Sequence, residues 1–431
     1  DVYKRQGKII DCSLNSCLPQ GFVAFNQLEE VALKWMASPV SLLLDVRRAY
    51  SNIQSCAGDN QNMHLRRMVW YKDPKPNADV NELEEVIYGI SPVHYGDRIA
   101  SCLLSNTLIK VSDDMEEDGF DEAAAKFRDS NYVDDEIAGC ETTTEAFDLY
   151  DTFTHYLGNY SLTLHEPVVS SLAGRHMSRN GEVLRKPPEG EPATIKAIGF
   201  EFSPYSDTFT IPIPKKLKQS KRSKFTLNKG VELTKDVILS MPHLSMRQMV
   251  SYSAAVFDLT GQIAPLTILG KRLIAKTMEA SPPNTKEAWD RPLPPSLLEE
   301  AKRYLLLMTS TAEAHFQRSP PLADSELTEV ACFHDGSSCA FGTVVYGIWS
   351  KDGNPVKRKA KLLFAKPRVA RRTVPDQELS SSLQSVLIAR VFARTFPSVK
   401  RITHFGDSEV THKQICSKSA QKDVWTLNRV R

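Results

Sequence analysis

The C-terminal part of the chain shows the clearest alternation of apolar and polar positions. Apolar stretches at 327–333, 341–349 and 361–365 have the length and the β-branched and aromatic content of strands. A helical pattern follows at 375–394, and another short apolar stretch occupies 400–405. Strands followed by a helix and a further strand predict one mixed sheet in an α/β or α+β layer fold.

The rest of the chain divides into two more regions. Residues 7–207 alternate helix-like and strand-like stretches, which predicts an α+β domain. Residues 208–327 contain a basic run, helical stretches and proline-rich turns, which are typical of a mixed connecting region. We therefore expect three domains, at 7–207, 208–327 and 328–431.

Composition narrows the class of protein. The 431 residues include 54 lysines and arginines and 52 aspartates and glutamates, so the net charge is only +2. This balance excludes a uniformly basic nucleic-acid coat, and any phosphate contacts must come from local patches. No stretch reaches the roughly 18 apolar residues of a membrane span, and the N-terminus lacks the pattern of a secretory signal. The eight cysteines contain no CxxC pair, so we expect an intracellular protein with reduced thiols.

Carboxylates at two separate positions form a first candidate site. Asp45 lies at the end of the apolar stretch 42–46, while Asp134 and Asp135 lie between apolar strands, as in a hairpin turn. If the hairpin brings Asp134 to Asp45, like charges that close need cations to stay ionised. Two magnesium ions about 3.5 to 4 Å apart would neutralise them and clamp the attacking and leaving oxygens of a phosphoryl transfer. The alternative is a helix cap at Asp45 and a solvated turn at Asp134.

The predicted C-terminal sheet contains a second set of carboxylates. Asp335 ends its first strand, Glu378 lies in the first turn of its helix, and Asp407 ends its last strand. We expect the three at one edge of the sheet, where they could bind two magnesium ions. Each residue alone is typical of a cap or a turn, and only the ordered set favours a metal site.

Several motifs resemble those of known proteins. Residues 44–50 (LDVRRAY), the Tyr-Gly-x-Ser-Pro at 88–92 and the Tyr-Val-Asp-Asp at 132–135 resemble the successive A, B and C motifs of reverse transcriptases. The order of Asp335, Glu378 and Asp407 resembles that of ribonuclease H. Residues 199–211, 252–265 and 365–370 resemble specifically the BEL/Pao family of long-terminal-repeat retrotransposons. The resemblance covers almost the whole chain.

The resemblance implies a fold and two active sites. The fold would be a polymerase palm with truncated fingers, a thumb- or connection-like region, and a C-terminally truncated ribonuclease H domain. Asp45 and Asp134 would hold the polymerase metals with Asp135 beside them, and the second carboxylate set would hold the ribonuclease H metals. Each site would use two Mg²⁺ or Mn²⁺ ions.

Four further residues are candidates for substrate binding. By the resemblance, Tyr50 would lie under the sugar of the incoming deoxynucleoside triphosphate, and Gly89 would let the backbone approach the template or the nucleotide. Lys366 and Arg368 belong to a basic run from 357 to 372, which would steer a hybrid duplex by its phosphates. A packed core tyrosine, a turn glycine and a solvated hairpin face are the respective alternatives.

The implied function is synthesis of DNA from an RNA template and a DNA primer, followed by removal of RNA from the RNA/DNA hybrid. A protease and an integrase, the latter for DNA integration, would belong to the same polyprotein, in a cytoplasmic virus-like particle with nuclear access left open. Only 44 residues precede Asp45, and the chain ends before the expected fourth ribonuclease H carboxylate, so we expect truncation at both ends. The alternatives are an inactive or domesticated relic that binds nucleic acid, and a structural module whose acids are caps and turns.

Overall fold

The computed structural model contains two compact units. The first comprises Asp1–Gln27, Leu42–Ala138 and Thr144–Pro167, and the second comprises Leu28–Ser41, Gly139–Thr143 and Val168–Arg431. The structure describes residues 14–53, 67–72, 84–90, 92–94, 96–171, 175–177, 183–184, 194–217, 232–280, 282, 285, 288–311, 314–351, 354 and 356–416. Within these ranges, no helix is long and apolar enough to span a bilayer.

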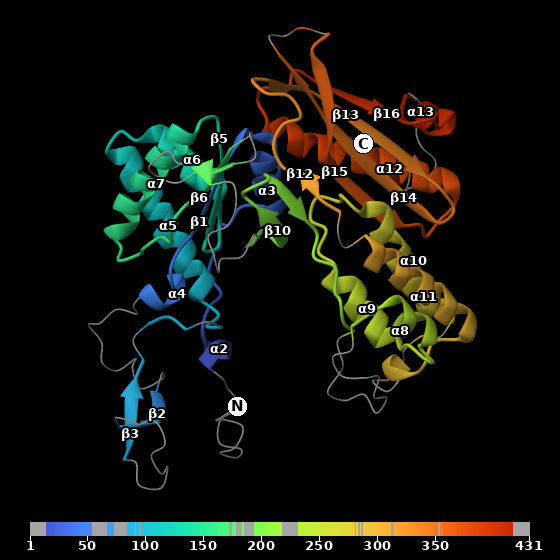
Figure 1. The fold of residues 1–431 in the computed structure, drawn as a ribbon, viewed down its shortest axis with the longest axis horizontal. Coiled ribbons are helices and arrows are strands. Elements are labelled where there is room, and N and C mark those ends of the chain that lie inside the picture. The colour runs from blue at the N-terminus through green and yellow to red at the C-terminus, as the bar shows by residue number, and fades with distance from the viewer. Residues whose placement is uncertain are drawn as a thin grey trace. The chain divides into compact units, whose positions relative to one another are not determined.

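The first unit combines short strands with amphipathic helices. Its elements are α2 (Leu14–Cys17), β1 (Val40–Asp45), α4 (Ala49–Asn52), β2 (Arg67–Tyr71), β3 (Glu85–Gly89), α5 (Ala100–Glu117), α6 (Asp121–Ser130), β4 (Asn131–Tyr132), β5 (Asp135–Cys140) and α7 (Thr143–Gly158). In α5, Leu104, Leu108, Val111 and Met115 are buried at spacings of three and four residues, so one face of the helix enters the core. Figure 1 shows α5, α6 and α7 beside β1 and β5.

The second unit holds most of the chain. Its first elements are α3 (Leu28–Ala37), β6 (Val168–Ser171), β7 (Arg175–Met177), β8 (Val183–Leu184), β9 (Ile195–Ala197), β10 (Phe200–Ser203) and β11 (Thr208–Thr210). Then follow α8 (Lys235–Ser240), α9 (Met246–Ala255), α10 (Ala264–Ala280), η3 (Ala288–Asp290), α11 (Pro295–Ser310), β12 (Phe316–Gln317), β13 (Glu326–Gly336), β14 (Ala340–Ser350), β15 (Arg358–Val369), α12 (Val374–Thr395), β16 (Arg401–Phe405) and α13 (Glu409–Cys416). The described strands form sheets in the orders β4-β5-β1-β6-β7-β8, β12-β11-β10-β9, β15-β14-β13-β16 and β2-β3.

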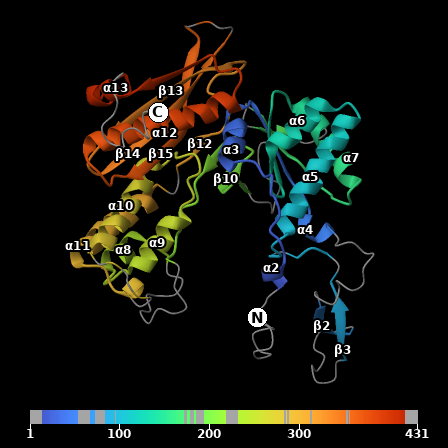
Figure 2. The same cartoon turned by 180° about the vertical axis from the view of Figure 1, so that it is seen from behind.

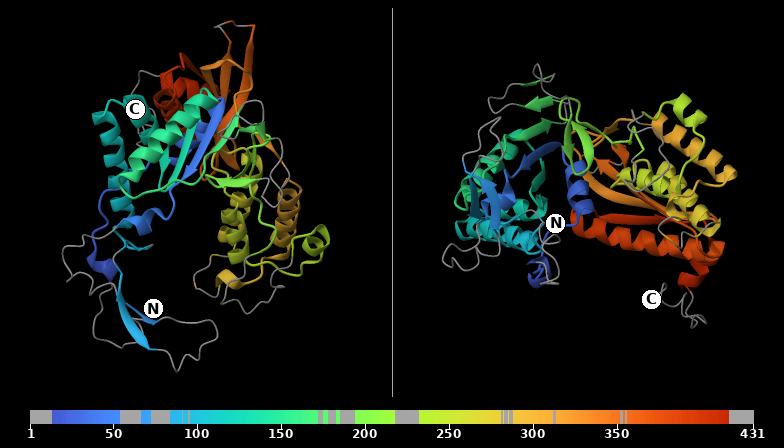
Figure 3. Two further views of the ribbon diagram at one scale, coloured as in Figure 1. Left: turned by 60° about the vertical axis from the view of Figure 1, so that its left-hand side comes forward. Right: turned by 90° about the horizontal axis from the view of Figure 1, so that it is seen from below.

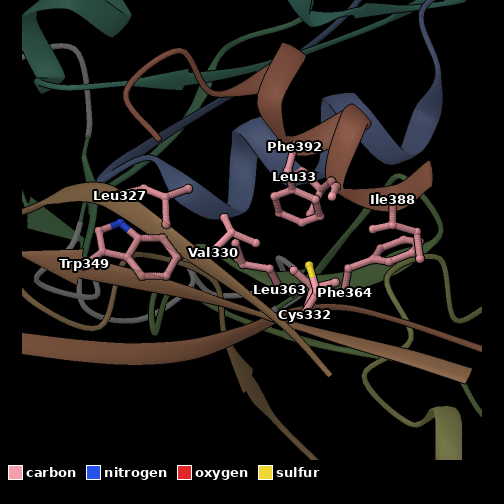
Figure 4. Close-up of a cluster of buried hydrophobic side chains, with 11 residues drawn as sticks. Leu33, Leu327, Val330, Cys332, Trp349, Leu363, Phe364, Ile388 and Phe392 are labelled. Atoms are coloured by element: carbon pink, nitrogen blue, oxygen red, sulfur yellow. The ribbon is translucent and has the colours of Figure 1, made fainter. Parts of the chain in front are cut away.

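The predicted mixed sheet is confirmed in the order β15-β14-β13-β16. Strand β13 pairs antiparallel with β14 and parallel with β16, and β14 pairs antiparallel with β15. Helix α12 runs along one face of this sheet (Figures 1 and 2). Buried apolar side chains of α12 and the strands, with Leu33 of α3, fill the space between them (Figure 4). This packing fixes the first turn of α12 relative to the ends of β13 and β16.

Helix α10 covers the edge of the same sheet. The Ala365 amide of β15 donates to the Thr260 carbonyl at 2.9 Å, just before α10 begins. Gly261 has φ of 75°, and a Cβ there would lie 1.9 Å from the Ala365 carbonyl oxygen, so only glycine permits this approach. Helices α9, α10 and α11 lie together below the sheet in Figures 1 and 2 and in the left view of Figure 3. The segment before α10 thereby satisfies one amide of this edge strand.

A buried ion pair crosses the second unit. The Arg318 side chain is fully buried, and its Nε lies 2.5 Å from Asp207 Oδ1. Its Nη atoms also donate to the carbonyls of Trp35, Ser38 and Pro39 at 2.7, 2.7 and 3.1 Å. One Nη also donates to Asp207 Oδ2 at 3.1 Å, so all five N–H donors of Arg318 find acceptors, which is the condition for burying a guanidinium.

Lys361 contacts the same region as the Arg318 ion pair, although the sequence predicted an exposed basic run there. Its Nζ donates to the carbonyls of Met36 and Ser319, each at 3.1 Å, and to that of Arg318. Burial, reinforced by the charge of Arg318, lowers the pKa of Lys361 to about 7. The basic run 357–372 is therefore not a uniform nucleic-acid surface, because one of its amines points into the protein.

Candidate active sites

Asp45, Asp134 and Asp135 come together at the end of β1 and the turn of the β4–β5 hairpin. Strand β1 is buried as far as Leu44, and Asp45 is exposed. The Val46 amide donates to the Asp134 carbonyl at 2.9 Å, which holds the turn against the end of β1. Because Tyr132 pairs with Asp135, the turn consists of Val133 and Asp134, rather than of the two carboxylates.

The electrostatics of this first site show that its carboxylates affect one another. The Asp45 side chain is half exposed, and its partial burial raises its pKa; His165 opposes this rise while Asp134 adds to it. Burial, with the charges of Asp134 and Asp45, raises the pKa of Asp135 to about 6. Negative charge is therefore concentrated where a cation would be stabilised.

His165 is a neighbour that the sequence did not assign to the site. Its Nε2 lies 3.3 Å from Asp45 Oδ2, and its backbone amide donates to the Asp45 carbonyl at 2.9 Å. No local pattern in the sequence indicated this contact.

Tyr50 and Gly89 lie in different environments. Tyr50, in α4, is 9% exposed, and its hydroxyl lies 3.5 Å from Ser101 Oγ. Gly89 is exposed at the end of β3, opposite Arg67 of β2. Ser91, the polar member of the Tyr-Gly-x-Ser-Pro motif, lies outside the described residues. The substrate-binding roles of Tyr50 and Gly89 stay predictions.

The second carboxylate set lines one pocket in the second unit. Asp335 lies near the end of β13, Glu378 in the first turns of α12, and Asp407 just after β16. All three border a cavity of about 190 Å³. A Cβ on Gly336 would lie 2.5 Å from the Glu378 amide nitrogen, so the absent side chain lets α12 approach the end of β13.

Hydrogen bonds hold the acids of this pocket. The Gly336 amide donates to Asp335 Oδ1 at 2.6 Å. The Ser408 hydroxyl donates to Glu378 Oε2. Ser408 stands directly before α13, where serine is typical of a helix cap, but the sequence did not indicate that it would reach Glu378.

Two histidines, His334 and His404, line the same pocket as the carboxylates. His334 Nδ1 is 3.3 Å from Ser381 Oγ, and His404 Nδ1 is 2.7 Å from Ser385 Oγ, so adjacent strands are each bonded to α12. Burial and then His404 lower the pKa of His334, while burial lowers that of His404. These pairs tie the helix that carries Glu378 to the strands that carry the aspartates.

The carboxylates do not form a closed ligand cluster. In the part of the chain that the structure describes, no three His, Cys, Asp or Glu side chains are arranged around a single metal position. Carboxylate oxygens are nevertheless the ligands that Mg²⁺ prefers, so the donor chemistry fits the predicted ion.

A basic pocket adjoins the second set. This cavity of about 690 Å³ lies between α10, β15 and the start of α12. Its cationic lining residues are Lys271, Lys366, Arg368, Arg371 and Arg372. One of its two acids, Asp258, accepts the amides of Gln262 and Ile263 at 2.8 and 3.0 Å. Lys271 comes from α10, far from the basic run in sequence, so the sequence did not predict it here.

Comparison with known families tests this second region. Residues 245–408 match the Pao retrotransposon-like RNaseH-like domain. The matched domain begins at Ser245, the capping residue of α9, and ends at Ser408, so it includes all three carboxylates and every residue of the basic pocket except Glu29. Helices α9 to α11 therefore fall within the matched region together with the mixed sheet.

One solved structure shares the fold at low sequence identity. The chain is 11% identical, with a TM-score of 0.52, to a structure described as the foamy viral protease-reverse transcriptase dRH in complex with ds DNA, covering 96% of this chain and 58% of that one. A second foamy viral protease-reverse transcriptase structure, in complex with an RNA/DNA hybrid, gives 12% identity and a TM-score of 0.49, covering 95% and 44%. The chain thus spans about half the length of these proteins. No curated protein sequence matches it.

Proposed function

We propose that residues 245–408 act as a ribonuclease H, which hydrolyses the RNA strand of RNA/DNA hybrids, within a fragment of a BEL/Pao-type retrotransposon polyprotein. The observation that carries this proposal is the meeting of Asp335, Glu378 and Asp407 in one pocket of a domain that matches the Pao RNaseH-like family. The structural neighbour with the shared fold is described in complex with double-stranded DNA, which agrees with a duplex as the partner.

The three carboxylates would hold two Mg²⁺ or Mn²⁺ ions. When bound, such ions activate a water and stabilise the departing 3′-oxygen. The chain's own residues prepare this arrangement: the Gly336 amide orients Asp335, and Ser408 orients Glu378. Lys366 and Arg368 lie on β15 beside the basic pocket, where they would contact phosphates without reading sequence.

Hydrolysis of a labelled RNA/DNA hybrid by the purified chain in Mg²⁺ tests the proposal. We expect RNA cleavage that requires the hybrid and that Asp407→Asn removes. Cleavage that persists in Asp407→Asn, or a wild-type chain that binds the hybrid but leaves it intact, would contradict the assignment. The latter result is the one that an inactive or domesticated relic predicts.

A second activity, RNA-directed DNA polymerisation, is proposed for the first unit. The observation that favours it is the convergence of Asp45 and Asp134 at the β4–β5 turn, where their charges interact. Asp45 and Asp134 would hold two metal ions, and the substrates would be an RNA template, a DNA primer and deoxynucleoside triphosphates. Protease and integrase regions would belong to the same polyprotein, in a virus-like particle. Primer extension in Mg²⁺ tests this role, and extension that survives Asp134→Asn would contradict it.

A further inference from the structure

Glu378 is held by a residue that neither the motifs nor the family match assigns to it. The Ser408 hydroxyl donates a hydrogen bond to Glu378 Oε2. Ser408 Oγ also accepts a hydrogen bond from the Thr411 amide at 3.2 Å, in the first turn of α13. The Ser408 carbonyl accepts the His412 amide at 3.0 Å, as expected at the start of a helix. Helix α13 therefore fixes the direction of the hydroxyl.

This contact links two of the three carboxylates. Ser408 follows Asp407 directly, so one backbone segment carries an acid of the pocket and holds another by its hydroxyl. Gly336 makes a comparable link at the opposite side, because its missing Cβ lets the backbone of Glu378 approach the residue after Asp335. Glu378 is thus located by its backbone relative to Asp335 and by its side chain relative to Asp407.

We propose that Ser408 is a positioning residue that keeps the Glu378 carboxylate in the pocket before metal binds. This proposal rests on the proposed ribonuclease H function. The physical reason is charge repulsion, because three acids share one cavity. A glutamate has three side-chain torsions, and mutual repulsion favours rotamers that leave the pocket. A neutral hydroxyl donor offsets that repulsion without adding a charge that would compete with the cation.

Removing the Ser408 hydroxyl can either weaken or tighten metal binding, and a binding measurement distinguishes the two. If the hydroxyl prepares Glu378, its removal weakens metal binding, because the ion must then also order the side chain. If the hydroxyl instead competes with the ion for Oε2, its removal tightens binding. Groups that orient metal ligands typically contribute about 10- to 100-fold to metal affinity.

The experiment compares four full-length proteins: wild type, Ser408→Ala, Ser408→Thr and the control Ser398→Ala. The control variant also loses one serine hydroxyl. The Ser398 hydroxyl, however, donates to the Leu327 carbonyl rather than to a residue of the pocket. Mg²⁺ and Mn²⁺ binding is measured by calorimetry, and hybrid cleavage is measured over a range of Mg²⁺ concentrations.

We expect Ser408→Ala to weaken Mg²⁺ binding about tenfold and to raise the Mg²⁺ concentration for half-maximal cleavage by the same factor, with a nearly unchanged rate at saturating Mg²⁺. Ser408→Thr should keep wild-type Mg²⁺ binding and the wild-type Mg²⁺ dependence of cleavage, because threonine retains the hydroxyl and the helix cap. Equal or tighter Mg²⁺ binding by Ser408→Ala would overturn the proposal. So would an equal loss in Ser398→Ala, since the effect would then be general destabilisation.

Failure of the proposed function gives a different pattern. In that case, wild type and Asp335→Asn show the same Mg²⁺ binding, and wild type does not cleave the hybrid. This result would contradict both proposals. If wild type binds and cleaves but Ser408→Ala matches it, only the role of Ser408 is overturned.

Discussion

The carboxylates of the first unit lie on a hairpin turn and at strand ends, whereas those of the second unit lie on a strand, on a helix and in the segment after another strand. In the first, the Val46 amide, directly after Asp45, donates to the Asp134 carbonyl, next to Val133 in a left-handed conformation. In the second, Gly336 and Ser408 set the distances between elements. The first site therefore depends on local backbone shape, and the second on packing between elements.

Each unit also buries an ionisable side chain, an acid in the first unit and an amine in the second. Burial raises the pKa of Glu136 in the first unit to about 8, opposed by hydrogen bonds from Asn131 and Ser130. In the second unit, burial lowers the pKa of Lys361 to about 7. The first unit thus favours a protonated acid and the second a neutral amine. Changes that act on one unit alone can test whether the two behave independently.

The largest expected effect is on activity. Asp134→Asn should abolish primer extension and leave hybrid cleavage within about twofold, while Asp335→Asn should do the reverse. Loss of a metal ligand removes several kcal/mol of transition-state stabilisation, which corresponds to about a thousandfold or more in rate. Both activities are measured on the same preparations. Loss of both activities in either variant would mean that the two sites are not separate.

Packing in the second unit predicts the next effect. Gly336→Ala should destabilise the protein by about 3 kcal/mol, because its Cβ would lie 2.5 Å from the Glu378 amide and 2.6 Å from the Gln377 carbonyl carbon. Gly158→Ala, at the end of α7 with nothing within 4 Å of the added Cβ, is the control and should be nearly neutral. Chemical denaturation measures both. Similar stabilities would show that α12 can move away from β13 at low cost.

The third effect is a pH dependence. Between pH 7 and about 10, the unfolded chain keeps the Lys361 proton while the folded chain has released it, so stability rises with pH across this window. From pH 7 to 9 the contribution is roughly 2 kcal/mol. Lys361→Met cannot titrate and should lose this rise. It should also be less stable, because the carbonyls of Met36, Arg318 and Ser319 lose their donor.

Lys359→Met is the matched control for this pH dependence. Lys359 is exposed two residues earlier on β15. Denaturation at pH 7 and pH 9 should show the wild-type rise in this variant. An unchanged slope in Lys361→Met would mean that the amine stays protonated, held by its three carbonyl acceptors.

The sequence predicted the positions of the second carboxylate set better than it predicted the residues around them. Asp335, Glu378 and Asp407 each stand at the end of a regular element, and apolar spacing predicts such ends; α12 was expected at 375–394 and spans Val374–Thr395. Lys361 could not be placed, because a run of basic residues indicates exposure and its burial depends on Arg318 and Asp207, which are distant in sequence. The contact of Ser408 with Glu378 likewise depends on the packing of α13 beside α12.

In the first site, the hairpin was predicted but its turn was not. The Asp-Asp pair suggested a turn made of both carboxylates, whereas Asp135 begins β5 and Val133 takes a turn position. Apolar and β-branched residues predict strand, so nothing in the sequence indicated a left-handed valine. A constraint that overrides local preference in this way must come from the contacts of the folded turn.

That valine gives the smallest predicted effect and the sharpest test of the comparison. Val133 has φ of 63°, which costs a β-branched residue about 1 to 2 kcal/mol, whereas glycine adopts it freely at an entropic cost of about 0.5 to 1 kcal/mol. Val133→Gly should therefore stabilise the protein by up to about 1 kcal/mol, and Val133→Ala should gain less. If the strained turn aims Asp134 at Asp45, primer extension should fall in Val133→Gly while stability rises. A glycine variant that is less stable would show that the valine side chain contributes more by packing than it costs by strain.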